Sequence, residues 1–112
     1  MSKTLFQKIA DRELPAEIVY EDDRAVAFRD INPQAPTHVL VIPRKPITRP
    51  DEIGEEDEAL VGHLFVVARK VAEQDGLTDY RLVMNNGAGA GQSVFHIHLH
   101  VLGGRALQWP PG

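Results

Sequence analysis

Apolar and polar residues alternate along this chain in a way that predicts five short strands and two helices. The predicted strands are residues 18–20, 25–28, 38–42, 80–85 and 94–102. The first two flank the polar turn 21–24 and are therefore expected to form a hairpin. Residues 38–42 are almost wholly apolar and rich in β-branched side chains, which is typical of a central strand buried on both faces. Residues 30–36, with two prolines, are expected to be a loop.

The two predicted helices differ in length and in apolar surface. Residues 4–11 show a short amphipathic pattern, with Thr4 as the N-cap and an apolar face of Leu5, Phe6 and Ile9. Residues 55–74 predict a long helix, because acidic residues occupy its first turn and Gly76 follows its end.

The long helix carries two apolar stripes side by side. They are Leu60, Leu64, Val67 and Val71 in one stripe, and Val61, Phe65, Ala68 and Ala72 in the other. A surface helix normally buries about one stripe. We therefore predict a homodimer that buries the second; the alternative is a helix that sinks deeper into its own core.

These elements indicate the fold class. Strands outnumber helices and neighbouring strands are close in sequence, so we predict an α+β fold with a mainly antiparallel five-stranded sheet, one long helix and one short helix. The 112 residues contain no repeat and no flexible linker, which predicts a single domain over residues 1–112.

Composition removes several classes of protein. With 43% hydrophobic and 25% charged residues, the chain is not of the disordered type. A net charge of −4 without a basic stripe argues against nucleic-acid binding. The absence of cysteine excludes disulfides and cysteine-based zinc sites. The apolar run 64–68 is too short to span a membrane, and nothing near Met1 resembles a signal peptide, so we expect a cytoplasmic protein without membrane contact.

Three of the five histidines lie within one predicted strand. Side chains in a strand alternate between its faces. His96, His98 and His100 are therefore expected on one face, whereas the apolar residues Phe95, Ile97, Leu99 and Val101 are expected on the other, beneath the long helix. Packing alone does not explain a strand with an apolar back and an imidazole front.

Two kinds of chemistry fit this strand. A zinc site is disfavoured because residues four apart in a strand are separated by about 13 Å, while zinc–nitrogen bonds are about 2.0 Å. A zinc site formed by two of these rings together with His38 remains an alternative. Nucleophilic catalysis fits better, because imidazole is largely neutral at pH 7 and His98 has a neighbouring ring on either side.

The preceding loop indicates a substrate for such a nucleophile. Residues 85–93 include three glycines, which allow backbone N–H groups to form an anion site. The alternative is a flexible turn without an anion site, which could contain the same glycines. Next to the histidine strand, however, the loop favours a phosphate substrate and nucleotidyl transfer through a nitrogen–phosphorus intermediate.

The histidine segment resembles a known signature. His96-Ile97-His98-Leu99-His100-Val101-Leu102 is similar to the histidine-triad (HIT) motif of alternating histidines and apolar residues. Further segments resemble the nucleotide-binding, HINT-like branch of that superfamily: Glu21-Asp22-Asp23-Arg24, Asp30-Ile31, Pro33 to His38, Gly91-Gln92-Ser93 and the tail Trp109-Pro110-Pro111-Gly112.

This resemblance implies a homodimeric HIT-like fold and a purine nucleoside phosphoramidase. Such an enzyme hydrolyses adenosine or guanosine 5′-monophosphoramidates to a nucleoside monophosphate and an amine, and neither metal nor cofactor is expected. The resemblance makes His98 the nucleophile that becomes nucleotidylated. It places the phosphate against His100 and Ser93, with loop contacts from Gly91 and Gln92.

The same resemblance assigns further positions. Asp30 and Ile31 would bind the nucleoside, with Asp30 on the ribose hydroxyls, and Asn85 would contact the nucleotide. His96 and His38 would orient the other rings. Trp109 either reaches the partner's site or packs on the surface. The alternatives are a dinucleoside polyphosphate hydrolase, against which the tail argues, a nucleotidylyltransferase, which His100 disfavours, and a nucleotide-binding adaptor with little turnover.

Overall fold

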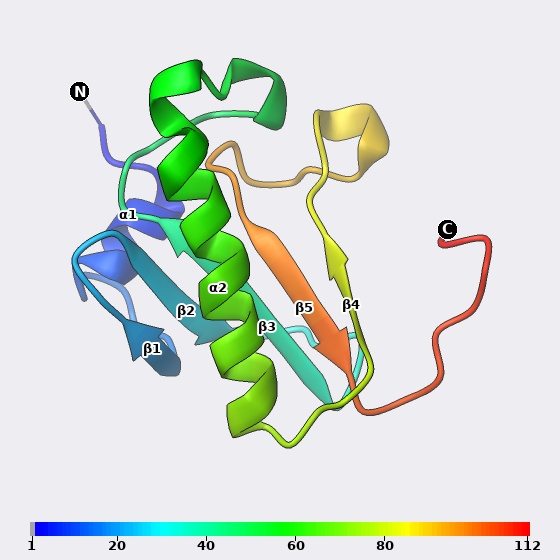
Figure 1. The fold of residues 1–112 in the computed structure, drawn as a ribbon. Coiled ribbons are helices and arrows are strands. Elements are labelled where there is room, and N and C mark those ends of the chain that lie inside the picture. Colours follow the sequence, from blue (N-terminus) through cyan, green and yellow to red (C-terminus); the bar gives the residue numbers. More distant parts are fainter. Residues whose placement is uncertain (1) are drawn as a thin grey trace.

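A five-stranded antiparallel sheet forms the centre of the protein (Figure 1). The computed structural model describes residues 2–112. The strands are β1 (Ile18–Glu21), β2 (Ala25–Arg29), β3 (Thr37–Pro43), β4 (Tyr80–Val83) and β5 (Leu99–Gly103), in the spatial order β1-β2-β3-β5-β4. The predicted α+β class, the five strands and the β1–β2 hairpin are confirmed.

Strand β3 lies in the middle of the sheet, as its composition predicts. All seven of its residues are buried. Its neighbours are β2 and β5, with Val41 opposite both Ala27 and Leu99. Strand β5, which carries His100, therefore pairs with the most buried of the described strands.

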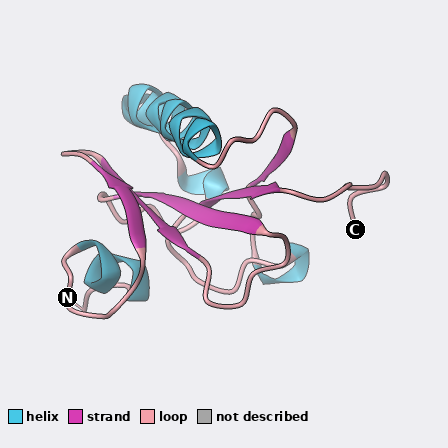
Figure 2. Cartoon of the chain, turned by 90° about the horizontal axis from the view of Figure 1, so that it is seen from below, coloured by secondary structure: helices cyan, strands magenta, loops and turns pink. Residues whose placement is uncertain are grey.

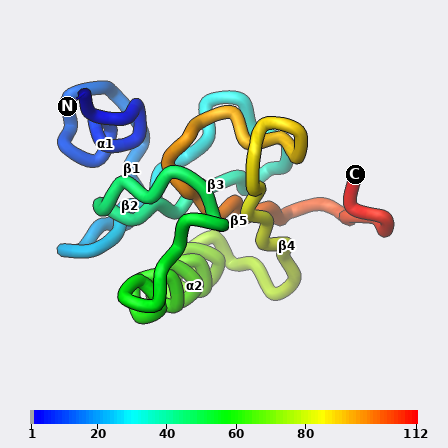
Figure 3. Tube along the Cα trace, turned by 90° about the horizontal axis from the view of Figure 1, so that it is seen from above, coloured from blue at the N-terminus to red at the C-terminus, as the bar shows by residue number. Residues whose placement is uncertain are grey.

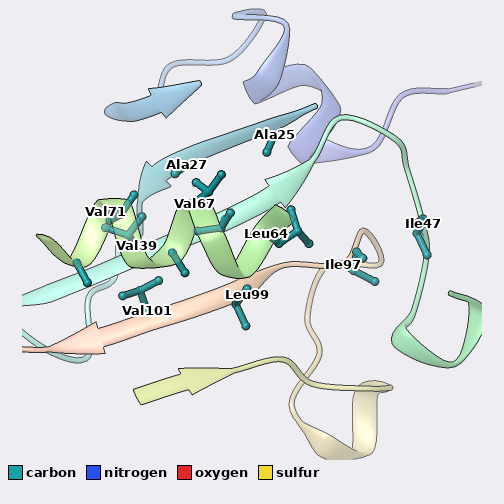
Figure 4. Packing of buried hydrophobic residues seen from close by; sticks show 13 residues of the cluster. Ala25, Ala27, Val39, Ile47, Leu64, Val67, Val71, Ile97, Leu99 and Val101 are labelled. Atoms are coloured by element: carbon teal, nitrogen blue, oxygen red, sulfur yellow. The ribbon is translucent and has the colours of Figure 1, made fainter. Parts of the chain in front are cut away.

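Helix α2 (Glu58–Gln74) covers one face of the sheet (Figure 2). Its Leu64, Val67 and Val71 pack on the odd-numbered apolar residues of β3 and β5 (Figure 4). Ala68 and Ala72, from the second predicted stripe, are also fully buried in this core. That stripe thus lies largely in the core beneath the helix, and Phe65 is its one exposed member, at 47%.

Helix α1 (Leu5–Ala10) lies against the opposite face of the sheet (Figure 3). Thr4 is its N-cap, as predicted. Phe6, Ile9 and Ala10 pack on a second apolar cluster, formed with Val26, Phe28, Leu40 and Ile42. Leu5 was expected on the same apolar face but remains 48% exposed.

Three element boundaries differ from the prediction by two or more residues. A 3₁₀ turn, Glu55–Asp57, precedes α2, so the helix begins at Glu58 and not at residue 55. Strand β4 ends at Val83, two residues early. The last strand begins at Leu99 and not at residue 94, because the chain ahead of it pairs elsewhere: the Ile97 N–H donates to the Ile47 carbonyl.

No helix within residues 2–112 is both long and apolar enough to cross a membrane.

Candidate active site

A cavity of about 490 Å³ opens between α1, the end of β2 and the chain leading into β5. Its apolar walls include Phe6, Ile9, Leu14, Phe28, Ile31 and Leu40. Its polar groups include Asp30, Ser93, His98 and His100. A larger hollow of about 680 Å³, lined by residues 76–81 and 104–107, contains none of the histidines. The smaller cavity has the size and mixed lining of a small-molecule site.

His98 presents an unprotonated nitrogen to this cavity. Its Nδ1 lies 2.9 Å from the carbonyl oxygen of His96. A carbonyl can only accept, so Nδ1 carries the proton and Nε2 keeps its lone pair. Every buried side-chain nitrogen or oxygen among residues 2–112 has a hydrogen-bond partner. Nε2 has none, so it must be accessible, and His98 lines this cavity.

A chain of hydrogen bonds sets the tautomer of His100. The Gln34 backbone N–H donates to Nδ1 of His38 at 3.0 Å. His38 must then carry its proton on Nε2, which lies 2.9 Å from Nδ1 of His100. His100 therefore accepts at Nδ1 and carries its own proton on Nε2. It is a hydrogen-bond donor beside the accepting nitrogen of His98, with ring centroids 4.9 Å apart.

Asp30 adds a carboxylate at the same end of the cavity. Its Oδ2 lies 3.5 Å from His38 Nε2, and its Oδ1 accepts the Asn32 N–H. One ligand atom from each of Asp30, His38 and His100 lies within 4.8 Å of the others. A cation there would have to replace the hydrogen bond between the two rings, so the hydrogen-bonded arrangement competes with metal binding.

His96 does not join the other rings at the cavity. It is fully buried, with Nε2 2.7 Å from the Pro43 carbonyl and Nδ1 2.7 Å from the Thr4 hydroxyl. Both ring nitrogens are thus occupied by protein groups. The alternation of side chains extends ahead of β5 as far as Ile97, which is buried in the core beneath α2. Phe95 was expected in the same core, but its side chain is 43% exposed.

Burial lowers the pKa of all four histidines at the site. Loss of hydration disfavours the charged form of His38, His96 and His98. For His100, burial together with the neighbouring His98 and His38 lowers the pKa to about 4. The four imidazole rings are therefore neutral at pH 7, which is the state a histidine nucleophile requires.

The glycine-rich loop is built differently from the anion site that its sequence predicts. The N–H groups of Ala90, Gly91 and Gln92 donate to carbonyls of the loop itself. The buried Gln92 side chain accepts the Gly87 N–H and donates to the carbonyls of Thr48 and Val94. In this conformation the N–H groups of Gly91 and Gln92 are therefore bonded within the loop, and the Gln92 side chain holds the loop together.

The other predicted positions lie around the cavity. Ser93 and Ile31 line it, and Ile31 is 96% exposed at its edge. Asn85 does not line the cavity but packs on Gly91, where a β-carbon would lie 3.3 Å from Asn85 Nδ2. Gly91 also has a φ of +101°, which favours glycine at this position.

Three contributions to the site escaped the sequence analysis. They are the Gln34 N–H that orients His38, the Thr4 hydroxyl that meets His96, and the cavity wall formed by Leu14 and Leu40. The cap pattern identified Thr4 as a helix start, but no local pattern joins it to a residue 92 positions away.

Comparison with known proteins agrees with the fold and the histidine pattern. Residues 11–107 match the HIT domain family. An uncharacterised HIT-like protein of Synechocystis sp. is 58% identical over 110 residues, which cover 97% of this chain and 96% of the relative. The crystal structure of a HIT family hydrolase from Legionella pneumophila has a TM-score of 0.95 and 50% identity, covering 98% of this chain and 100% of that one. A HIT family hydrolase from Clostridium thermocellum has a TM-score of 0.93 and 45% identity, with 96% of each chain covered. The histidine-triad resemblance is thereby confirmed at the level of the family, and this chain belongs to the HIT domain family.

Proposed function

We propose that this protein is a hydrolase of the HIT family that cleaves the P–N bond of purine nucleoside 5′-phosphoramidates. The observation that carries the proposal is the pairing of two neutral histidines with opposite roles. His98 offers an unprotonated Nε2, and His100 offers an Nε2–H beside it. A nucleophile next to a hydrogen-bond donor suits attack on a phosphoryl group.

The cavity has a place for each part of a nucleotide. Its apolar walls, including Phe6, Phe28 and Leu40, suit a purine ring. The Asp30 carboxylate can accept hydrogen bonds from both ribose hydroxyls. The phosphate would then face His98, His100 and Ser93, whose backbone N–H has no acceptor among residues 2–112.

The reaction proceeds in two displacements. In the first, Nε2 of His98 forms a bond to phosphorus, and the P–N bond of the substrate breaks. Its electron pair goes to the amine nitrogen, which takes up one proton as it leaves. In the second, water attacks phosphorus, the bond to His98 breaks, and one proton is released with the nucleoside monophosphate. His100 donates a hydrogen bond to the phosphoryl group in both steps, and the His96 carbonyl stabilises the cationic ring of nucleotidylated His98.

The test is release of AMP from adenosine 5′-phosphoramidate by the purified protein in excess EDTA. We expect multiple turnovers without metal. Because burial lowers the histidine pKa values below about 6.5, turnover should stay level from about pH 8 to 6.5 and fall only on further acidification. Cleavage of a diadenosine polyphosphate in place of the phosphoramidate would make the protein a polyphosphate hydrolase. AMP binding without turnover of either compound would make it a binding protein.

We further propose that the protein is a homodimer that uses the outer side of α2. Phe65 and Val66 there are 47% and 41% exposed, so the helix presents two neighbouring large apolar side chains to solvent. Sedimentation equilibrium should give twice the chain mass, and Phe65→Glu should shift the protein toward the monomer. If the unmodified protein at micromolar concentration has the mass of a single chain, the proposal is contradicted.

A further inference from the structure

The hydroxyl of Thr4 takes part in two hydrogen bonds of opposite direction. Its Oγ1 accepts the Gln7 N–H at 2.9 Å, which caps α1. The same oxygen lies 2.7 Å from Nδ1 of His96. The cap uses only a lone pair, so the single hydroxyl proton remains for the histidine.

The partners of His96 require that this proton points to the ring. Nε2 of His96 faces the Pro43 carbonyl, which can only accept, so Nε2 carries the proton of the neutral ring. Nδ1 then has a lone pair, and the Thr4 hydroxyl is the one donor that reaches it among residues 2–112. Because His96 is fully buried, an unpaired Nδ1 would be costly.

This hydrogen bond joins the wall of the cavity to the segment that carries His98. Helix α1 has only six residues, too few to be stable without tertiary contacts. Its Phe6 ring meets the His98 ring edge-on, at a centroid distance of 5.0 Å, and lies 5.9 Å from His96. The backbone carbonyl of His96 in turn holds the Nδ1 proton of His98. Thr4 thus contacts the residue that fixes the nucleophile's tautomer.

We propose that Thr4 is a positioning residue: its hydroxyl proton satisfies the Nδ1 lone pair of the neutral His96 ring, and this bond holds α1 against the cavity. Only the consequence for nucleotide binding rests on the proposed function. The tautomer of His96 follows from the hydrogen bonds alone and can be measured whether or not the protein is a phosphoramidase.

The experiment compares Thr4→Val, Thr4→Ser and Thr4→Asp, with Thr78→Val as a matched control. Thr78 is exposed and lies outside the histidine cavity. Imidazole ¹⁵N shifts report the tautomer of His96 and whether its Nδ1 accepts a hydrogen bond, and calorimetry with AMP reports binding. Thr4→Val removes both hydrogen bonds of the hydroxyl, while the Pro43 carbonyl still holds the proton on Nε2. We therefore expect the Nδ1 shift to move to that of a lone pair without a donor, and the Kd for AMP to rise about tenfold. Thr4→Ser and Thr78→Val should match the unmodified protein within about twofold.

Thr4→Asp separates the cap from the proton donor. An aspartate caps a helix as well as a threonine does, but it carries no proton at neutral pH. His96 would face an acceptor at each ring nitrogen, so we expect it to take up a second proton and show imidazolium shifts near pH 7.

Two results would overturn the proposal. One is an Nδ1 shift of His96 that is unchanged in Thr4→Val, or a neutral His96 ring that persists in Thr4→Asp. The other is a change of the Nδ1 shift in Thr4→Ser as large as in Thr4→Val. If the unmodified protein neither binds AMP nor cleaves the phosphoramidate, the proposed function fails, and the ¹⁵N shifts still decide the role of Thr4.

Discussion

Replacing His98 with asparagine is expected to lower kcat for adenosine phosphoramidate by at least about 10³-fold, while AMP still binds. The asparagine side-chain amide can donate to the His96 carbonyl in place of the Nδ1–H, so the cavity keeps its shape. It has no basic lone pair with which to attack phosphorus. AMP release in steady state gives kcat, and calorimetry gives the Kd for AMP.

His63→Asn is the matched control for this variant. His63 lies on α2 with Nε2 2.6 Å from Asp22, outside the cavity, and should be replaceable with turnover kept within a few fold. Mass spectrometry of the acid-sensitive nucleotidyl adduct, trapped by rapid quenching in mild base, should find it on the unmodified protein and not on His98→Asn. Near-normal turnover by His98→Asn would refute nucleophilic catalysis by this residue.

Replacing His38 with leucine is expected to lower kcat by about 10²-fold through the tautomer of His100. Leucine removes the Nε2–H that donates to His100 Nδ1. His100 can then place its proton on Nδ1, which leaves an acceptor where the phosphoryl group needs a donor. Because His38 does not line the cavity, the Kd for AMP should change by less than kcat does.

His38→Gln tests this explanation, because its side-chain amide keeps an N–H donor near His100. We expect this variant to recover part of the lost kcat, and ¹⁵N shifts of His100 should show the Nε2–H tautomer returning with it. Equal kcat for His38→Leu and the unmodified protein would show that His38 does not set the chemistry of His100. Unchanged His100 shifts in a slow His38→Leu variant would contradict the tautomer mechanism.

Much of the fold could be predicted because its signals are local. The alternation of residues 97–101 predicts which side chains face α2, since a strand repeats every two residues. The composition of β3 predicts its central place, and Thr4 predicts the start of α1. The histidine spacing indicated a candidate site and the family, because a row of imidazoles on one face has no ordinary packing role.

Predictions were less accurate where a distant residue decides the structure. The last strand starts at Leu99 because Ile97 pairs with Ile47, which comes from a connection with no strand pattern. The glycine-rich loop turns three N–H groups inward, since its own carbonyls accept them and the Gln92 side chain holds it closed. The second stripe of α2 predicts an interface, yet Ala68 and Ala72 are buried within the chain.

The sequence by itself therefore determined the elements, the face on which each histidine lies and the family. Only the tertiary structure decided the protonation of each ring, because a tautomer depends on the partner at each nitrogen. Those partners are the His96 carbonyl for His98, His38 for His100 and the Pro43 carbonyl for His96. Two of these three bonds join residues more than fifty positions apart, and no periodicity of side chains encodes contacts over that distance.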